Sequence, residues 1–410
     1  MSAEQPRDVS RIVSWVMRIV LLVLFAFLYG VYSGVTRGPA YAVISSLLDT
    51  TRQVLEQVPN LLGTEPVDFL QPARQPGAGV TINETDDGRL VAISGFFDGQ
   101  NGIRLMRRDG TVVASWTLSF SRDFPETGYL RSIAPKTDWN VDLHGMVVKP
   151  DGSVLVNYEY AGLIKLDRCG RTQWTLEHPT HHSIEPAEGG GYWVPGLRFL
   201  IPGAMEDSFP PFTDMRNARE FFDNLILKVT EDAFAPAFPQ FRAGDLLLSL
   251  REHNMLLVVD PVTWRVKWSQ VGPWRRQHDP RFMADGTITL FNNNAYRTIL
   301  GEGDESPVDA PRVSEIGRLD PKTGQYGTAW GNRPGQEMLS VIRGKEVPTA
   351  GGGFIVTEFE AGRAFETDAA GRIVWEYINR YDETRVAEIT EARSYPASYF
   401  TVSDWSCPTP

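Results

Sequence analysis

The chain has 410 residues and a formal net charge of −11, with 51 acidic and 40 basic side chains. This length exceeds one ordinary globular core of ~100 to 150 residues but suits a repeat domain. The acidic balance offers no broad basic surface for a phosphate backbone, so we expect no nucleic-acid partner.

The N-terminal segment predicts a membrane anchor. Residues 12–35 are almost wholly apolar and are about long enough to cross a bilayer. Arg7 and Arg11 precede this run and Arg18 lies in its N-terminal part, against Arg37 on the other side. The positive-inside rule therefore places the N-terminus in the cytoplasm and the rest of the chain on the periplasmic, extracytoplasmic side. We expect residues 1–38 to form a cytoplasmic tip and a transmembrane helix that contacts lipid through 12–35.

A cleaved signal peptide is the alternative interpretation, with Ala40-Tyr41-Ala42 as a small-x-small cleavage site. This site lies several residues past the apolar core, and the apolar run is long for a signal peptide. A retained signal-anchor is therefore favoured, and both interpretations export the remaining chain.

Residues 39–79 predict a juxtamembrane helix followed by a linker. Apolar residues recur at helical spacing between Ala42 and Leu62. The stretch from Gln71 to Gly79 contains the Pro and Gly residues typical of a linker.

Residues 80–410 predict an all-β domain, a six-bladed β-propeller with a C-terminal tail. A unit recurs in which an Asp-Gly or Gly-Gly turn joins two strands, a D-x-x-G turn follows, and the last strand ends near a Trp. Radial repetition of such units leaves short edges and buries aromatic residues between blades. A large β-sandwich is disfavoured because it does not account for the repeat. We place the blades at 80–118, 142–176, 180–236, 243–270, 279–331 and 350–377, the third containing Gly189–Val194 and Leu225–Val229.

The two cysteines, Cys169 and Cys407, could form a disulfide that closes a long loop in an oxidising compartment. The sequence leaves open whether their geometry permits the bond. No Cys/His spacing resembles a zinc site, and we expect neither a metal nor a cofactor.

Three histidines share one place in the repeat. His144, His182 and His278 each come shortly before the turn that opens a blade, so ring closure would bring them to one mouth of the channel. Arg251 ends a strand of the fourth blade and would add a fork of donors. Neutral imidazoles beside a fixed arginine suit a sulfate-like or phosphate-like group.

A plainer interpretation stays open for each of these residues. A single histidine near a propeller turn more often hydrogen-bonds a backbone carbonyl, and Arg251 could pair with Glu252 or Asp279. The remaining histidines lack the repeated context and are interpreted as surface or supporting residues: His178, His181 and His253.

Three stretches carry a family resemblance: RAGDLLLSLREHNMLLVVDPVTWRVKWSQVGPWRRQHDPRFMADGTITLFNNN, DLHGMVVKPDGSVLV and HHSIEPAEGGGYWVPG. Over roughly 140–400 the chain resembles the bacterial aryl sulfotransferases, which are periplasmic six-bladed propellers. The resemblance implies sulfuryl transfer from a phenolic sulfate ester donor to an acceptor hydroxyl, without a nucleotide. It also implies that His278 is the nucleophile that forms a sulfohistidine, that Arg251 stabilises the sulfuryl oxygens, and that His182 polarises the substrate. His144 is a weaker catalytic candidate.

Substrate binding is expected to involve Trp193 and Trp274, whose rings could stack on a phenol. The family pattern has a His-x-Asn pair on the strand entering the fourth blade, where this chain has Ile226 and Lys228. Lys228 would restore part of the positive field, but only as a point charge on a flexible stem.

This departure keeps a second function open, in which the propeller is catalytically inactive. It would then bind an envelope protein or a polysaccharide as a subunit of a membrane assembly, with a membrane protein as partner. A quinone-dependent dehydrogenase propeller is a third hypothesis, disfavoured because the sequence shows no acidic cluster for its metal.

Overall fold

The computed structural model describes most of the chain as two separate units, one of which contains the N-terminal helix and the other the β-sheets. The described residues are 7–36, 38, 51, 55, 57–85, 87–187, 190–196, 225–229, 235–263, 265–294 and 313–407. For 7–10, 131–133, 225–229 and 235 the description covers the backbone only.

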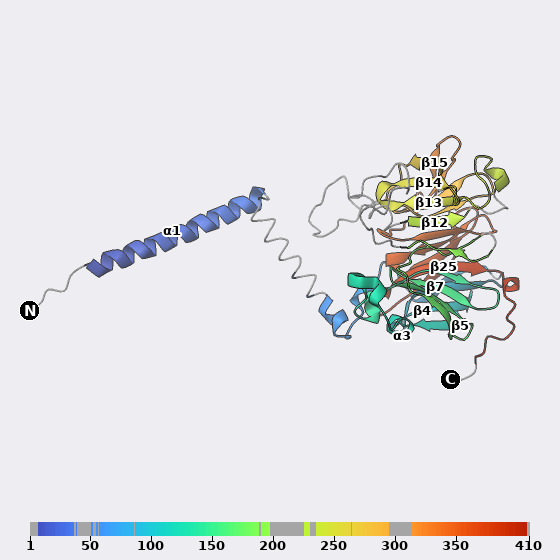
Figure 1. Ribbon diagram of the computed structural model, residues 1–410, viewed down its shortest axis with the longest axis horizontal. Coiled ribbons are helices and arrows are strands. Elements are labelled where there is room, and N and C mark those ends of the chain that lie inside the picture. The colour runs from blue at the N-terminus through green and yellow to red at the C-terminus, as the bar shows by residue number, and fades with distance from the viewer. Residues whose placement is uncertain are drawn as a thin grey trace, which may run out of the picture. The chain divides into compact units, whose positions relative to one another are not determined.

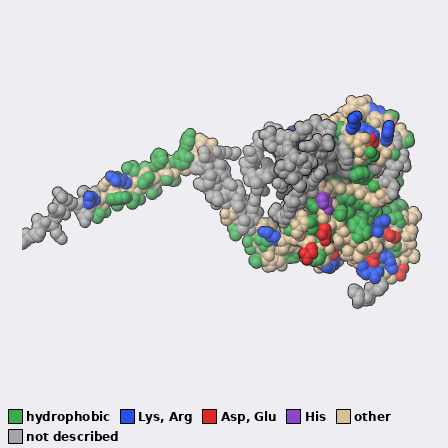
Figure 2. Space-filling model, viewed as in Figure 1, with side chains coloured by type: hydrophobic (Ala, Val, Ile, Leu, Met, Phe, Trp, Pro, Cys, Tyr) green, Lys and Arg blue, Asp and Glu red, His purple; other side chains and the backbone are tan. Residues whose placement is uncertain are grey.

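The N-terminal helix α1 runs from Arg7 to Thr36. Its segment Arg11–Thr36 has a mean hydropathy of 2.4 and is long and apolar enough to cross a membrane, although a signal sequence has the same features. Figure 2 shows apolar side chains along most of this helix, with basic ones toward its N-terminal end. Within the predicted juxtamembrane helix, the described residues 51, 55 and 57–61 are helical.

The second unit is a β-propeller, which confirms the predicted fold class (Figure 1). Five antiparallel sheets of four or five strands follow one another. Each blade is given from its innermost strand outward. The first blade consists of β25 (Ile389–Tyr395), β3 (Leu90–Phe97), β4 (Gln100–Arg107) and β5 (Val112–Leu118), and the second of β6 (Leu143–Val148), β7 (Val154–Tyr158), β8 (Gly162–Leu166) and β9 (Thr172–Leu176). The next two consist of β12 (Leu225–Val229), β13 (Leu246–Leu250), β14 (Met255–Val259) and β15 (Val266–Val271), and of β16 (His278–Phe282), β17 (Ile288–Asn292), β18 (Glu315–Leu319) and β19 (Tyr326–Trp330), and the last blade consists of β20 (Lys345–Pro348), β21 (Phe354–Glu358), β22 (Arg363–Thr367), β23 (Ile373–Ile378) and β2 (Gly79–Asn83).

The ring closes through strands from both ends of this unit. β25 completes the first blade on its inner side by pairing with β3, and β2 extends the last blade on its outer side by pairing with β23. The predicted first blade, 80–118, was therefore wrong at its start, because β2 belongs to the last blade. These two pairings tie the N-terminal and C-terminal parts of the propeller together.

Five blades are described where six were predicted. In the predicted third blade, the described strands are the short pair β10 (Glu185–Pro186) and β11 (Tyr192–Trp193). β12 was expected in the same blade, but it pairs with β13 as the inner strand of the next one. β10 contacts β12, so this pair lies between the second complete blade and β12.

The segment expected to be a linker contains a short strand, β1 (Leu70–Pro72), which pairs with β24 (Arg385–Ala387). A helical turn at Val67–Phe69 precedes it. Phe69 stacks on Phe96 with 4.2 Å between ring centroids, so this stretch packs on the first blade.

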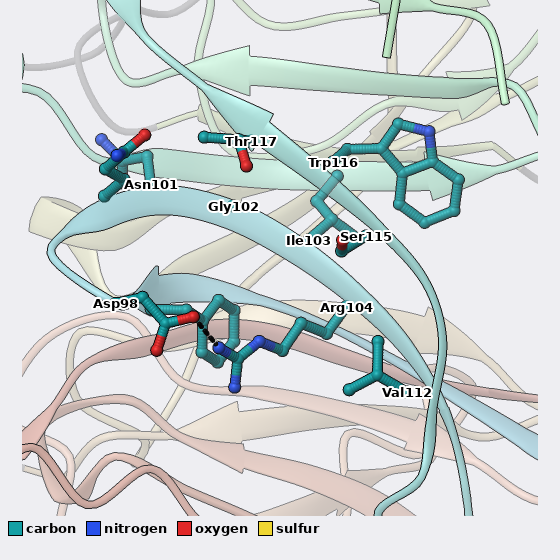
Figure 3. A pocket seen from close by; sticks show the side chains of 11 residues that line it. Asp98, Asn101, Gly102, Ile103, Arg104, Val112, Ser115, Trp116 and Thr117 are labelled. Atoms are coloured by element: carbon teal, nitrogen blue, oxygen red, sulfur yellow. Dashed lines mark hydrogen bonds and ion pairs between the residues drawn. The ribbon is translucent and has the colours of Figure 1, made fainter. Parts of the chain in front are cut away.

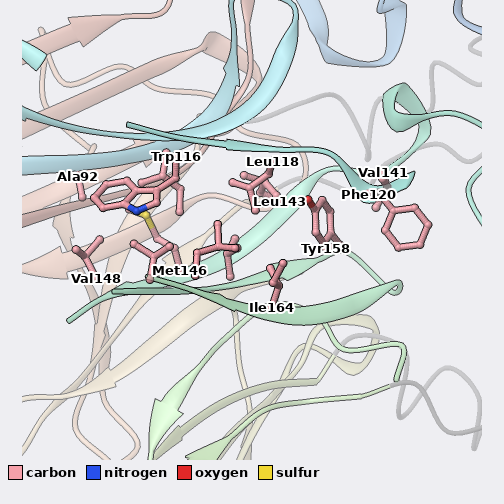
Figure 4. Close-up of a cluster of buried hydrophobic side chains, with 14 of the residues drawn as sticks. Ala92, Trp116, Leu118, Phe120, Val141, Leu143, Met146, Val148, Tyr158 and Ile164 are labelled. Carbon is pink, nitrogen blue, oxygen red and sulfur yellow. The ribbon is translucent and has the colours of Figure 1, made fainter. Parts of the chain in front are cut away.

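Buried side chains fill the spaces between neighbouring blades. Figure 4 shows the cluster between the first two blades, where Trp116 lies among aliphatic side chains of β6. Its indole N–H donates to the carbonyl of Asp167, in the D-x-x-G turn of the second blade. Trp330 and Trp375 also donate to the corresponding turn of the following blade, at the carbonyls of Gly371 and Arg108. The repeated Trp and the repeated turn thus join each of these blades to the next.

The C-terminal tail crosses the second blade and is tied to it by a disulfide. Cys407 bonds Cys169 across a sequence separation of 238 residues. Trp405 packs edge-on against Trp116, with 6.3 Å between ring centroids. The tail is therefore part of the propeller.

Candidate functional site

Two bulged inner strands present histidines at equivalent places. In β6, Leu143 pairs with Tyr158 and Met146 pairs with Val156, so His144 and Gly145 together face Asn157. β16 has its own register shift immediately after His278, which pairs with Phe291. A bulge of this kind turns a side chain out of the regular pleat and is common beside active sites.

The structure brings His144, His182 and His278 together in the interior of the propeller. Ring centroids are 3.9 Å apart for His144 and His182, and 5.9 Å apart for His182 and His278, whose rings are nearly parallel. All three side chains are buried. His182 has a φ of +61°, and a Cβ on Gly145 would lie 1.9 Å from the His182 carbonyl oxygen, so only glycine fits there.

His181 is also part of this cluster, which the sequence did not predict. It is fully buried, and its Nδ1 lies 2.5 Å from Nδ1 of His182. One of the two rings must donate the proton of this hydrogen bond and the other must accept it. Of the two roles that the sequence left open for His181, a surface or a supporting residue, the structure favours the second, because the ring is buried and its hydrogen bond reaches His182.

The tautomer of His278 is fixed by Asn293. The Asn293 amide group donates from Nδ2 to the carbonyls of Ser340 and Arg343, at 2.7 Å each, so its Oδ1 is left as an acceptor. His278 Nδ1 lies 2.6 Å from this oxygen and 3.0 Å from the Arg276 carbonyl. The ring proton is therefore on Nδ1, and the lone pair of His278 is on Nε2.

His144 has a corresponding partner of different chemistry. Its Nδ1 lies 3.3 Å from Oε1 of Glu159, and the other carboxylate oxygen binds the guanidinium of Arg343, which also binds Asp142. Both histidines meet their partners 15 residues further along the chain. The two blades thus present the same histidine geometry with a carboxylate behind one ring and a neutral amide behind the other.

The Nε2 atoms of His144, His182 and His278 are buried and have no hydrogen-bond partner among the described residues. Burial lowers the pKa of all three imidazoles well below its usual value, and neighbouring positive charge adds to this effect. The three rings are therefore neutral near pH 7, with Nε2 available to a substrate.

Arg251 follows β13 in a short helical turn, Arg251–His253. Its positive charge contributes to the lowered pKa of His182 and His278, so Arg251 acts electrostatically on the histidine cluster. Its Nε and Nη2 donate to Glu252 at 3.0 and 2.8 Å, and Arg276 donates to the same carboxylate oxygen at 2.9 Å. Of the two carboxylates considered from the sequence, Glu252 is the partner of Arg251, while Asp279 pairs with Arg281.

The residues predicted to bind substrate lie on other elements than the clustered histidines: Trp193 on β11, Trp274 before β16 and Lys228 on β12. Trp274 is buried in the apolar core around Phe238, 5.4 Å from the Tyr326 ring, where it packs as a structural residue. Trp193 is half-buried on β11 and packs against the leucines of β13. Lys228 pairs with Leu247 through the backbone, and its side chain lies outside the described residues.

A pocket elsewhere on the first blade is lined by β4 and β5 (Figure 3). Arg104 binds Asp98 at its rim and covers the ring of Phe97. None of the six histidines lines this pocket, so it is separate from the histidine cluster. Among the described residues, no group of three His, Cys, Asp or Glu side chains is arranged to hold a metal ion.

The comparison with protein families agrees with the resemblance predicted from the sequence, which is confirmed. Residues 201–380 match a family model described as arylsulfotransferase (ASST). This range includes Arg251, His278 and Asn293. A comparison with curated proteins finds no match.

Solved structures include similar proteins at low sequence identity. A protein of unknown function from Bacteroides caccae is 13% identical, with 75% of this chain and 99% of that chain covered and a TM-score of 0.46. The Pan2 WD40 domain of Neurospora crassa is 13% identical (73% and 76% covered, TM-score 0.38). A catalytically inactive virginiamycin B lyase from Staphylococcus aureus, with quinupristin, is 11% identical (80% and 98% covered, TM-score 0.38). Because these scores lie below 0.5, the propeller assignment rests on the sheet topology.

Proposed function

We propose that this chain, a propeller of the arylsulfotransferase family, transfers a sulfuryl group from a phenolic sulfate ester to an acceptor hydroxyl through a covalent intermediate on His278. The observation that carries the proposal is the Asn293–His278 hydrogen bond, which leaves a neutral, buried Nε2 lone pair without a partner in the described part of the chain. Such a nitrogen is a competent nucleophile, and a covalent intermediate divides one difficult transfer into two easier ones.

In the first half-reaction, Nε2 of His278 attacks sulfur and the bond from sulfur to the phenolic oxygen breaks. The phenolate leaves and takes a proton from solvent. Negative charge on the three sulfuryl oxygens needs positioned donors, which Arg251 supplies once it exchanges its contact with Glu252 for the substrate. His182, between His144 and His278, polarises the same group.

In the second half-reaction, the acceptor hydroxyl loses its proton to Nε2 of His144 as its oxygen attacks sulfur. The N–S bond to His278 breaks, and His144 then returns the proton to solvent. The carboxylate of Glu159 behind Nδ1 of His144 stabilises the imidazolium that forms, whereas the amide behind His278 leaves that ring neutral. The different partners thus support different roles for two similarly placed histidines.

We further propose that α1 anchors the protein in a membrane, with the propeller on the extracytoplasmic side. The apolar span of α1 supports the anchor, and the Cys169–Cys407 disulfide fits an oxidising compartment. Sulfuryl transfer without a nucleotide would suit such a compartment.

The mass of the intact protein after incubation with 4-nitrophenyl sulfate tests the proposal. We expect a gain of one sulfuryl group per chain, mapped to His278 and absent in His278→Ala, whose circular dichroism should match the wild type. No mass gain in the wild type, together with no release of 4-nitrophenol, would reject the transferase and favour the inactive, binding propeller.

A further inference from the structure

Asn157 on β7 is a buried amide without a protein partner. Its exposed fraction is 0%, and neither Oδ1 nor Nδ2 has a hydrogen-bond partner among the described residues. Most buried polar side chains in folded proteins are hydrogen-bonded, since a missing bond leaves the cost of desolvation uncompensated. An unpartnered amide therefore calls for a ligand or for a functional reason.

The pleat of β7 directs Asn157 toward the histidine cluster. Val154, Val156 and Tyr158 belong to the core between the first two blades, while Leu155 packs with Ile184 on the opposite face. Because side chains alternate along a strand, Asn157 shares the face of Leu155. That face is turned toward the segment that carries His181 and His182.

The bulge in β6 brings the amide close to two of the candidate catalytic residues. His144 and Gly145 together lie opposite Asn157 in the sheet register. Nδ2 of Asn157 lies 3.5 Å from the position of a Cβ on Gly145, and the same position is 1.9 Å from the carbonyl oxygen of His182. The amide is thus beside the backbone that holds His144 and His182.

The blade that carries His278 shows that the fold does not need an amide at the position of Asn157, because it has an apolar side chain at the equivalent position. The interval from His144 to Asn157 equals the interval from His278 to Phe291, and the Asp-Gly turns of the two blades align in the same way. Phe291 is fully buried in an apolar core cluster. An apolar side chain therefore satisfies this position structurally.

We propose that Asn157 is a substrate-binding residue, whose Nδ2 donates a hydrogen bond to a sulfuryl oxygen of the aryl sulfate bound at the histidine cluster. The inference rests on the proposed function for the identity of its ligand. A sulfuryl oxygen is an acceptor that suits an amide N–H donor, and the bound ester would satisfy the Nδ2 donor that the protein leaves unpaired.

The decisive variant is Asn157→Leu, which has nearly the same size and no polar atoms. It should raise the melting temperature, because it removes an unpaired buried amide, and it should raise KM for 4-nitrophenyl sulfate about tenfold, the effect of one hydrogen bond to a charged group. Asn101→Leu is the matched control, since Asn101 is also buried on a blade but donates to the Val141 carbonyl at 2.8 Å. The control should lower the melting temperature and leave KM unchanged.

Asn157→Asp provides a second variant that keeps the shape and places a carboxylate in the site. It should weaken binding of the anionic donor more than Asn157→Leu does, and it keeps the test available if the leucine variant does not fold. A wild-type KM in both variants, or a lower melting temperature for Asn157→Leu, would overturn the assignment.

Equilibrium binding of 4-nitrophenyl sulfate to His278→Ala separates this inference from the proposed function. Binding that weakens when Asn157→Leu is added supports the role of Asn157 even if the wild type transfers no sulfuryl group. Binding that is insensitive to Asn157→Leu overturns the role even if transfer by the wild type is intact.

Discussion

The side-chain oxygen of Asn293 accepts a hydrogen bond from Nδ1 of His278 across 2.6 Å, and both groups are buried. The amide of Asn293 is itself held by two backbone carbonyls, so it cannot rotate to present its nitrogen to the ring without losing both bonds. The histidine is therefore oriented by the backbone of the neighbouring blade, through one intervening side chain.

Removing this support should slow sulfation of His278. In Asn293→Ala, Nδ1 keeps only the longer contact with the Arg276 carbonyl, and the ring gains rotational freedom. Losing one buried hydrogen bond of roughly 1.5 kcal/mol corresponds to about a tenfold slower single-turnover release of 4-nitrophenol. The KM for the donor should change little, because the ring's position, and not the binding of the donor, is affected.

Asn294→Gly serves as the control for Asn293→Ala. Asn294 is adjacent, has a φ of +54° that glycine adopts readily, and makes only an exposed side-chain bond to Val313. Equal slowing in both variants would show that the effect comes from the loop rather than from the orientation of His278.

Glu159→Gln should slow the second half-reaction more than the first. The substitution keeps the shape but removes the charge that would stabilise an imidazolium on His144, and a positioned general base contributes ~10²-fold or more to a rate. The first turnover should appear as a burst of 4-nitrophenol, followed by a steady state at least about tenfold slower than in the wild type. Asp142→Asn removes the other carboxylate on Arg343 and should not produce this burst; a burst in both variants would assign the effect to Arg343.

The sequence predicted the propeller and three of the clustered histidines because both depend on short, repeated patterns. The Asp-Gly turns need glycine at positive φ, as at Gly152 and Gly286, and the repeated Trp residues fill the spaces between blades. His144, His182 and His278 share a position in that repeat, so closing the ring is enough to bring them together. Trp274 was misread because an aromatic residue near the channel and one in the core have the same local sequence.

Glu159, Asn293 and Asn157 were missed for a different reason. Glu159 and Asn293 each contact a histidine across the bulged part of a hairpin, and Asn157 lies opposite such a bulge. No motif marks residues in these positions. A signal was nonetheless present: aligning the two blades by their histidines places Glu159 and Asn293 at the same offset. The extra strands of the closing blades, β2 and β25, could not be assigned from the repeat either, because they belong to blades remote from them in sequence.

The rate of sulfation should be flat near neutral pH and fall only in acid. Protonation of His278 removes the nucleophile, and burial, together with Arg251, lowers its pKa well below its usual value. Above about pH 6.5, where an ordinary histidine begins to be neutral, the single-turnover rate should therefore not change with pH. A rate that halves between pH 7.5 and pH 6.5 would mean that His278 titrates like an exposed histidine.

The same pKa values make stability depend on pH with a definite sign. His144, His182 and His278 stay neutral in the folded protein, while the unfolded chain takes up protons on them below about pH 6.5. The free energy of unfolding should thus be fully present above that pH and decrease as the pH falls below it. In His182→Asn the loss of melting temperature between pH 7 and pH 5 should be smaller than in the wild type.

Arg251→Lys should impair transfer although it conserves the charge. Lysine cannot place two donors on neighbouring sulfuryl oxygens as the guanidinium fork does, and losing one preorganised donor typically costs ~10²-fold in kcat. Arg318→Lys is a suitable control, because Arg318 pairs with Asp285 at the propeller surface. A kcat for Arg251→Lys within about threefold of the wild type would show that Arg251 does not stabilise the sulfuryl oxygens, since a threefold difference is smaller than the effect of losing one donor.

The Cys169–Cys407 disulfide should stabilise the propeller without taking part in the reaction. It joins the turn after β8 to the C-terminal tail, and a bond across 238 residues restricts the unfolded chain strongly. The double variant Cys169→Ser, Cys407→Ser should lose roughly 2 to 5 kcal/mol of unfolding free energy in urea titrations. Its kcat at 20 °C should equal that of the wild type, because neither cysteine lies on β6 or β16, the strands that hold His144 and His278. A parallel loss of kcat in the folded variant would show instead that the tail, through the second blade, helps to position His144.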